Sequence, residues 1–137
     1  MTKYLNILLI EDNLIELMKM KRTVSFLKLE HQITEAKNAE VALEILEDTT
    51  KLPDLILLDL NMPKISGIEF LSILKSKDEF RHIPTVILTT SNNKKDLEEC
   101  YRIGVSGYIL KPLKYEDYIM KIKKVLSYWS INELIKN

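Results

Sequence analysis

The chain has 137 residues, of which 46% are hydrophobic and 29% are charged, and this fits one globular domain with a single core. Twenty Lys and Arg residues balance 20 Asp and Glu residues, and the zero net charge argues against nucleic acid or a membrane surface as a partner. Cys100 is the only cysteine, so we expect a cytoplasmic protein, and no apolar run approaches the roughly 20 residues of a membrane span.

Five short apolar runs are predicted to form the strands of a parallel sheet. They cover residues 6–10, 32–36, 55–58, 85–88 and 108–110. The first, third and fourth runs consist almost entirely of Ile, Leu and Val, which is typical of strands buried on both faces. The second run contains Gln32, Thr34 and Glu35, so we expect it at an edge of the sheet.

Helical patterns alternate with these runs. The first two patterns cover residues 14–29 and 39–47. The earlier one is expected to bury one face, made of Leu14, Leu17, Met18, Val24 and Leu27. The third pattern begins at Ser66, because Glu69 lies three residues later and completes a capping box.

The last two helical patterns cover residues 94–103 and 115–128. The former stops at Gly104, a residue type that commonly ends helices. The latter carries an apolar stripe of Tyr118, Ile122, Val125 and Trp129. Strict alternation of strands and helices predicts an α/β fold, a doubly wound parallel sheet with helices on both faces.

The end of the chain allows two interpretations. Residues 1–128 account for the alternating domain, which leaves residues 129–137 as a C-terminal extension. This extension contains the apolar residues Trp129, Ile131, Leu134 and Ile135. It is predicted either to continue the last helix and pack on its own domain, or to form a homodimer contact.

Polar residues follow four of the predicted strands. Glu11 and Asp12 follow the first strand, and Asp59 follows the third. The fourth strand is followed by Thr89, Thr90 and Ser91, and the fifth by Lys111. Sites in open parallel sheets form beyond the C-terminal ends of the strands, so we expect these side chains to converge at one edge.

The chemistry of this group favours a metal and a phosphoryl group. Three carboxylates held close together repel one another, and a hard divalent cation such as Mg²⁺ removes that conflict. Lys111 offers a compact positive charge to a phosphoryl oxygen, and Thr89 offers a hydroxyl donor. Asp59 can then attack phosphorus as a carboxylate nucleophile.

Each residue also has a purely structural interpretation. Glu11 and Asp12 could begin the first helix, Asp59 could form an Asx-turn, and Thr89 could simply end a strand. Lys111 could be a surface lysine before Pro112. The ordered placement of all of them after strand ends favours the functional interpretation.

Five motifs resemble the receiver domain of two-component response regulators. They are residues 9–13 (LIEDN), 57–63 (LLDLNMP), 66–67 (SG), 88–91 (LTTS) and 107–112 (GYILKP). The resemblance spans about residues 4–128. It implies the flavodoxin-like (βα)5 arrangement with strand order 2-1-3-4-5.

The resemblance also implies a role for each site residue. Asp59 matches the phosphoacceptor, and Asp12 matches the direct Mg²⁺ ligand, with Glu11 acting through water. Asn61 matches the position whose backbone carbonyl binds the metal, and Lys111 matches the lysine that binds the phosphoryl group. The other matches are the switch residues Thr89 and Tyr108, Gly67 after the phosphoacceptor loop, and a cis Lys111–Pro112 bond.

The implied function is that of a phosphorylation-operated switch rather than a conventional enzyme. A sensor histidine kinase would pass a phosphoryl group from its phosphohistidine to Asp59, and water would later remove it. Asn61 and Ser91 are expected to influence its lifetime. The face formed by residues 94–103, 108–110 and 115–128 would change shape for partner binding, dimer exchange or onward phosphorelay.

A narrower resemblance concerns the kinase. Residues 81–84 (RHIP) together with residues 88–91 (LTTS) resemble single-domain regulators that are often paired with bacterial phytochrome-type kinases. This pattern implies a phytochrome-type kinase as the partner. The downstream protein target does not follow from it.

Three other functions account for parts of this pattern. A haloacid-dehalogenase phosphatase also uses a strand-end Asp with Mg²⁺, but it carries a second Asp where this chain has Asn61. A flavodoxin relative needs a phosphate-binding loop where Glu11 and Asp12 would repel phosphate. The third is a phosphorylation-independent binding module with the same fold, against which the complete acidic set and Lys111 argue.

Overall fold

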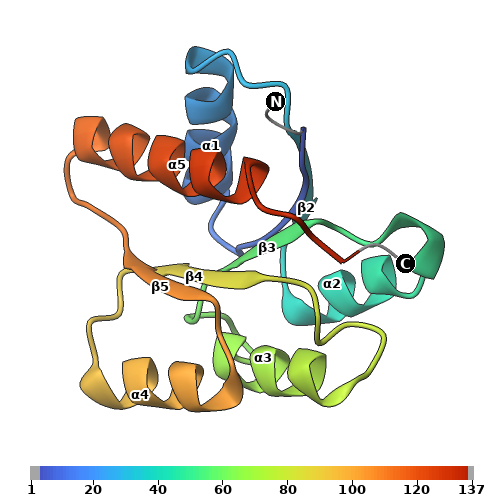
Figure 1. Ribbon diagram of the computed structural model, residues 1–137. Coiled ribbons are helices and arrows are strands. Elements are labelled where there is room, and N and C mark those ends of the chain that lie inside the picture. Colours follow the sequence, from blue (N-terminus) through green and yellow to red (C-terminus); the bar gives the residue numbers. More distant parts are fainter. Residues whose placement is uncertain (1–3, 136–137) are drawn as a thin grey trace.

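The computed structural model describes residues 4–135, which form a five-stranded parallel sheet between two layers of helices (Figure 1). The strands are β1 (Asn6–Ile10), β2 (Gln32–Ala36), β3 (Leu55–Leu58), β4 (Thr85–Thr89) and β5 (Gly107–Leu110). Their order is β2-β1-β3-β4-β5, and every neighbouring pair is parallel. The predicted fold and strand order are therefore confirmed, and β2 lies at an edge as expected.

Five α-helices cover the sheet. They are α1 (Leu14–Phe26), α2 (Ala39–Leu46), α3 (Gly67–Ser76), α4 (Lys94–Ile103) and α5 (Tyr115–Ser130). Helices α1 and α5 cover one face, and α2, α3 and α4 cover the other (Figure 1). The central strands β1, β3 and β4 contribute to both layers of the core because their successive side chains point to opposite faces.

Local capping explains where two of these helices begin and end. Ser66 accepts a hydrogen bond from the Glu69 backbone, and the Glu69 side chain accepts one from the Ser66 backbone, which completes the predicted capping box of α3. Helix α4 ends at Gly104, whose φ of 123° suits a residue without a Cβ. Both predicted boundaries are confirmed.

The first helix differs from its prediction in length and in the face it buries. It ends at Phe26 rather than at residue 29, and a positive φ at Lys28 turns the chain toward β2. Leu14 is 69% exposed and Met18 is 60% exposed, whereas Met20 is buried. Apolar residues occur on several sides of this helix, and the side that packs against the sheet and is buried carries Leu17, Met20 and Val24.

The fifth helix runs two residues beyond its predicted end. Trp129 and Ser130 belong to α5, and Trp129 and Leu134 pack against the core layer of α1 and α5. Ile131 and Ile135 remain exposed. A dimer contact through this extension stays a prediction, and residues 136–137 lie outside the described part of the chain.

A short 3-10 helix, η1 (Thr49–Lys51), was not predicted. It follows α2 and is capped by the Asp48 side chain, which accepts from the Thr50 backbone. Within residues 4–135, no helix has the length and apolar character needed to cross a membrane.

Candidate functional site

Backbone pairing continues one residue beyond the strands and brings the predicted site residues to one edge of the sheet. The backbone N–H of Glu11 donates to Ala36 O over 3.0 Å, and that of Asp59 donates to Ile10 O over 3.1 Å. On the other side, Lys111 N donates to Thr89 O over 2.8 Å. Because all five strands are parallel, these residues all stand at the C-terminal ends of their strands.

Three carboxylates form the acidic part of the site. One oxygen each from Glu11, Asp12 and Asp59 lies within 4.8 Å of the other two. Glu11 and Asp59 are buried, whereas Asp12 is exposed to solvent. A hard cation with several bound waters, such as Mg²⁺, prefers this kind of oxygen donor set. The residues present therefore fit a magnesium site.

Lys111 supplies the positive charge at this edge. Its Nζ donates to Glu11 Oε1 over 2.5 Å and lies 3.7 Å from Glu16 Oε2. The lysine side chain is 6% exposed, so the ammonium group is held inside the protein by these two carboxylates. The expected cis bond was wrong: the Lys111–Pro112 bond is trans, the isomer that X–Pro bonds generally favour.

Burial shapes the electrostatics of Glu11. The pKa of Glu11 is raised to about 7, chiefly by burial; the Lys111 ammonium opposes this rise, and the Asp59 carboxylate adds to it. The charged form of Glu11 is therefore costly in the absence of a further cation. A divalent metal at the three carboxylates would remove much of this cost.

Thr89 and Tyr108 meet at one residue of the β4–α4 loop. The Thr89 side chain is fully buried, and its Oγ1 accepts from the Ser91 backbone N–H over 3.2 Å. The Tyr108 hydroxyl donates to Ser91 O over 2.8 Å. A displacement of Thr89 would therefore disturb its hydrogen bond with Ser91, and a movement of Ser91 would in turn disturb the hydrogen bond with Tyr108.

The predicted lifetime residues lie in different surroundings. Asn61 is exposed, two residues after Asp59 in the loop that leads to α3. The Ser91 hydroxyl donates to Asp96 Oδ2 over 2.8 Å, so it is directed toward the first turn of α4 rather than toward the three carboxylates. Any influence of these two residues on phosphoryl lifetime remains a prediction.

Gly67 allows α3 to begin against the backbone at the phosphoacceptor position. Its N–H donates to Leu60 O over 3.0 Å. A Cβ added at Gly67 would lie 2.6 Å from Leu60 Cα and still closer to the Asp59 carbonyl oxygen. Neither backbone atom can move without displacing Asp59, so the site requires glycine here.

Replacing Gly67 by alanine should therefore destabilise the protein and disturb the site. We expect the free energy of unfolding to fall by about 2–3 kcal/mol, as for other forced overpacking. Urea denaturation would measure the loss. Gly107→Ala is the matched control, because its Cβ would meet the Val86 methyl groups at an ordinary 3.7 Å. Equal losses in the two variants would contradict this account of Gly67.

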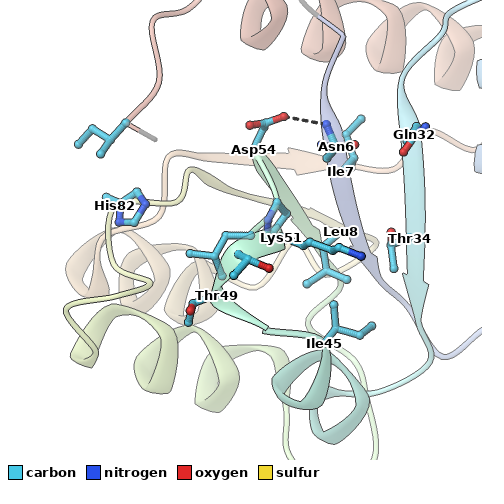
Figure 2. A pocket seen from close by; sticks show the side chains of 14 residues that line it. Asn6, Ile7, Leu8, Gln32, Thr34, Ile45, Thr49, Lys51, Asp54 and His82 are labelled. Carbon is cyan, nitrogen blue, oxygen red and sulfur yellow. Dashed lines mark hydrogen bonds between the residues drawn. The ribbon is translucent and has the colours of Figure 1, made fainter. Parts of the chain in front are cut away.

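A sizeable cavity lies away from this site. It has a volume of about 550 Å³ and lies near the opposite end of the sheet, where β1, β2 and β3 begin (Figure 2). Its lining includes Asn6, Gln32 and Asp54, and Asp54 accepts a hydrogen bond from the Asn6 backbone over 2.8 Å. None of the predicted site residues lines it.

The family follows from comparison with known proteins. Residues 7–123 match the model of the response regulator receiver domain. This chain belongs to the response regulator receiver family. The probable methanogenesis regulatory protein FilR2 of Methanothrix harundinacea is 36% identical over 127 residues, which cover 90% of this chain and 82% of FilR2. Response regulator Rcp1 of a Synechocystis species is 30% identical, over 90% of this chain and 87% of Rcp1.

Solved structures of receiver proteins agree with the fold. The phosphorylated cyanobacterial phytochrome response regulator RcpA superposes with a TM-score of 0.89 at 30% identity, covering 96% of this chain and 98% of that one. The Mn²⁺-bound form of Rcp1 superposes with a TM-score of 0.86 at 28% identity, covering 97% and 99%. Receiver domains are signalling switches in two-component systems, and this chain has their architecture.

Sequence reasoning missed one charged residue of the receiver site. Glu16 approaches Lys111 from the first turn of α1, although the two residues are 95 positions apart in the chain. The only local signal is its place three residues after Asn13, whose side chain caps α1 by accepting from the Glu16 backbone. That signal concerns helix capping and does not indicate a contact with Lys111.

Proposed function

We propose that this receiver domain accepts a phosphoryl group on Asp59 with the help of Mg²⁺. The observation that carries the proposal is the cluster of Glu11, Asp12 and Asp59 oxygens within 4.8 Å, with the Lys111 ammonium at the same edge. Asp12, Asp59 and the Asn61 backbone carbonyl would hold the metal directly, and Glu11 would hold it through water. When bound, the metal would neutralise negative charge on the phosphoryl oxygens.

The proposed reaction is transfer from a phosphohistidine. A carboxylate oxygen of Asp59 forms a bond to phosphorus while the bond from phosphorus to the histidine nitrogen breaks. The histidine leaves as neutral imidazole when its other ring nitrogen carries the proton. Lys111 binds a phosphoryl oxygen, and later attack by water returns Asp59 to the carboxylate and releases phosphate. Positioning and charge neutralisation provide most of the catalysis in such transfers.

The proposed output is a change in the face formed by α4, β5 and α5. The phosphoryl group adds negative charge and hydrogen-bond acceptors beside Thr89. Thr89 would move toward it, and Tyr108 would follow through Ser91, to which both residues are hydrogen-bonded. This face would then bind a partner, exchange dimers or support onward relay.

A sensor histidine kinase is the proposed donor. The names of Rcp1 and RcpA place those relatives among response regulators, and RcpA is named as a phytochrome response regulator. This likeness supports a phytochrome-type kinase for the present chain.

Labelling by a small acyl phosphate tests the proposal. We expect the protein to gain one phosphoryl group in Mg²⁺ and none in excess EDTA, measured by intact mass. Peptide mapping should locate the group on Asp59. A protein that binds Mg²⁺ but is never labelled, by the acyl phosphate or by a cognate kinase, would instead support the phosphorylation-independent binding module.

A further inference from the structure

We infer that Glu16 is a positioning residue of this site, which holds the Lys111 ammonium when Glu11 turns toward the metal. The inference rests on the proposed Mg²⁺ site, and it adds a residue that the motifs do not contain. Glu11 is the close counter-ion of Lys111 in the metal-free site, and Glu16 would take over this role in the metal-bound site.

The geometry around Lys111 is asymmetric. Its Nζ lies 2.5 Å from Glu11 Oε1 but 3.7 Å from Glu16 Oε2. The Glu16 side chain is 22% exposed, yet its Oε2 atom is buried and has no hydrogen-bond partner among residues 4–135. A buried carboxylate oxygen without a partner is costly, so Glu16 has a free acceptor directed at a cation that is already engaged elsewhere.

The gap can be closed by a small movement. A charge-assisted hydrogen bond between an ammonium and a carboxylate spans roughly 2.7–2.9 Å, so a shift of roughly 1 Å brings Lys111 Nζ to Glu16 Oε2. An ammonium group has three donors, and it can therefore bind Glu16 while it gives another donor to a phosphoryl oxygen.

Local packing keeps Glu16 available to Lys111. Its backbone is fixed at the start of α1, where its N–H donates to Asn13 Oδ1 over 3.1 Å. The other nearby cation, Lys19, lies 3.8 Å from Glu16 Oε1 and is drawn over the Tyr118 ring, with its Nζ 4.4 Å from the ring centroid. Lys19 thus approaches one carboxylate oxygen, and the other faces Lys111.

Metal binding would change which carboxylate balances Lys111. Glu11 is one of the three clustered carboxylates and also the close partner of Lys111. It would therefore be shared between the Lys111 ammonium and the proposed Mg²⁺. With Glu16 present, Lys111 retains a counter-ion when Glu11 is drawn toward the metal. Without that charge, Glu11 stays with Lys111 and contributes less to metal binding.

Glu16→Gln is therefore expected to lower Mg²⁺ affinity about tenfold, the effect typical of losing an outer partner of metal-binding groups. Calorimetric titration with Mg²⁺ at pH 8 measures this without any phosphoryl transfer. Glu69→Gln is the matched control, because Glu69 is the third residue of α3 as Glu16 is of α1, and glutamine preserves its capping box. It should leave Mg²⁺ affinity within about twofold, as screening predicts for an exposed charge.

A double-mutant cycle separates action through Lys111 from a general effect of charge. In a Lys111→Met background, Glu16→Gln should have no further effect on Mg²⁺ affinity. The same loss of effect is expected in a Glu11→Gln background, which serves if Lys111→Met does not fold. Circular dichroism on each variant verifies the fold.

The outcomes are distinct. An effect of Glu16→Gln that is equal to that of Glu69→Gln, or unchanged in either background, would overturn the inference. A cycle with the expected coupling in a protein that takes no phosphoryl group on Asp59 would support the role of Glu16 and refute the proposed phosphoryl transfer.

Discussion

The Asp59→Asn protein is expected to keep its fold and to accept no phosphoryl group. The amide is nearly the same size as the carboxylate but offers no anionic oxygen to attack phosphorus. Removal of one of three crowded carboxylates also relieves repulsion, since Asp59 is one cause of the raised pKa of Glu11. Its free energy of unfolding should therefore stay within about 1 kcal/mol of wild type, or rise.

Two further variants serve as comparisons for the labelling of Asp59→Asn. Asp12→Asn should slow labelling by the acyl phosphate without abolishing it, because Asp59 is intact and only a metal ligand is weakened. Asp117→Asn removes an exposed carboxylate in the first turn of α5 and should be labelled like wild type. Intact-mass measurements over time distinguish the three variants. Labelling of Asp59→Asn at the wild-type rate would place the acceptor elsewhere.

The sheet could be predicted almost completely from the sequence. Strands β1, β3 and β4 lie in the middle of the sheet and are almost wholly buried, which is why their sequences are runs of Ile, Leu and Val. The position of the site could be predicted from the strands, because Glu11, Asp59 and Lys111 immediately follow strands that are predicted to be parallel. A parallel sheet converts that position in the chain into proximity in space.

Features that depend on packing between distant elements could not be predicted in the same way. The sequence of α1 is apolar on several sides, and only its contact with the sheet leaves Leu14 and Met18 exposed. The approach of Glu16 to Lys111 joins a helix start to the end of the last strand, and no local pattern encodes it. The isomer of the Lys111–Pro112 bond likewise depends on surroundings that the Lys-Pro pair itself does not specify.

Lys111 has a structural role besides its proposed role toward the phosphoryl group. It is the cation that balances the buried Glu11 and the partly buried Glu16. Removing one partner of a buried ion pair leaves an uncompensated charge, which typically costs about 3–5 kcal/mol. We therefore expect Lys111→Met to lower the free energy of unfolding by about 3 kcal/mol at pH 8 without metal, the lower end of that range because Glu16 is partly exposed.

The pH dependence of this loss has a definite sign. Glu11 has a folded-state pKa of about 7, above that of a free carboxyl group, so its charge costs stability above pH 7 and this cost is removed as the pH falls and the group becomes neutral. The charged Glu11 is the group that most needs Lys111. The difference between Lys111→Met and wild type should accordingly shrink between pH 8 and pH 5.5, as measured by urea denaturation in EDTA.

Lys121→Met is the matched control, because Lys121, like Lys111, lies beside the end of β5. Lys121 is exposed and donates to the Leu110 carbonyl over 3.0 Å, so its replacement should change the free energy of unfolding by less than about 0.5 kcal/mol at either pH. If Lys111→Met lost no more stability than Lys121→Met, or if its loss grew as the pH fell, Glu11 would not depend on Lys111 for charge balance. The ammonium would then serve the phosphoryl group alone, and the shared use of Glu11 by two cations would lose its physical basis.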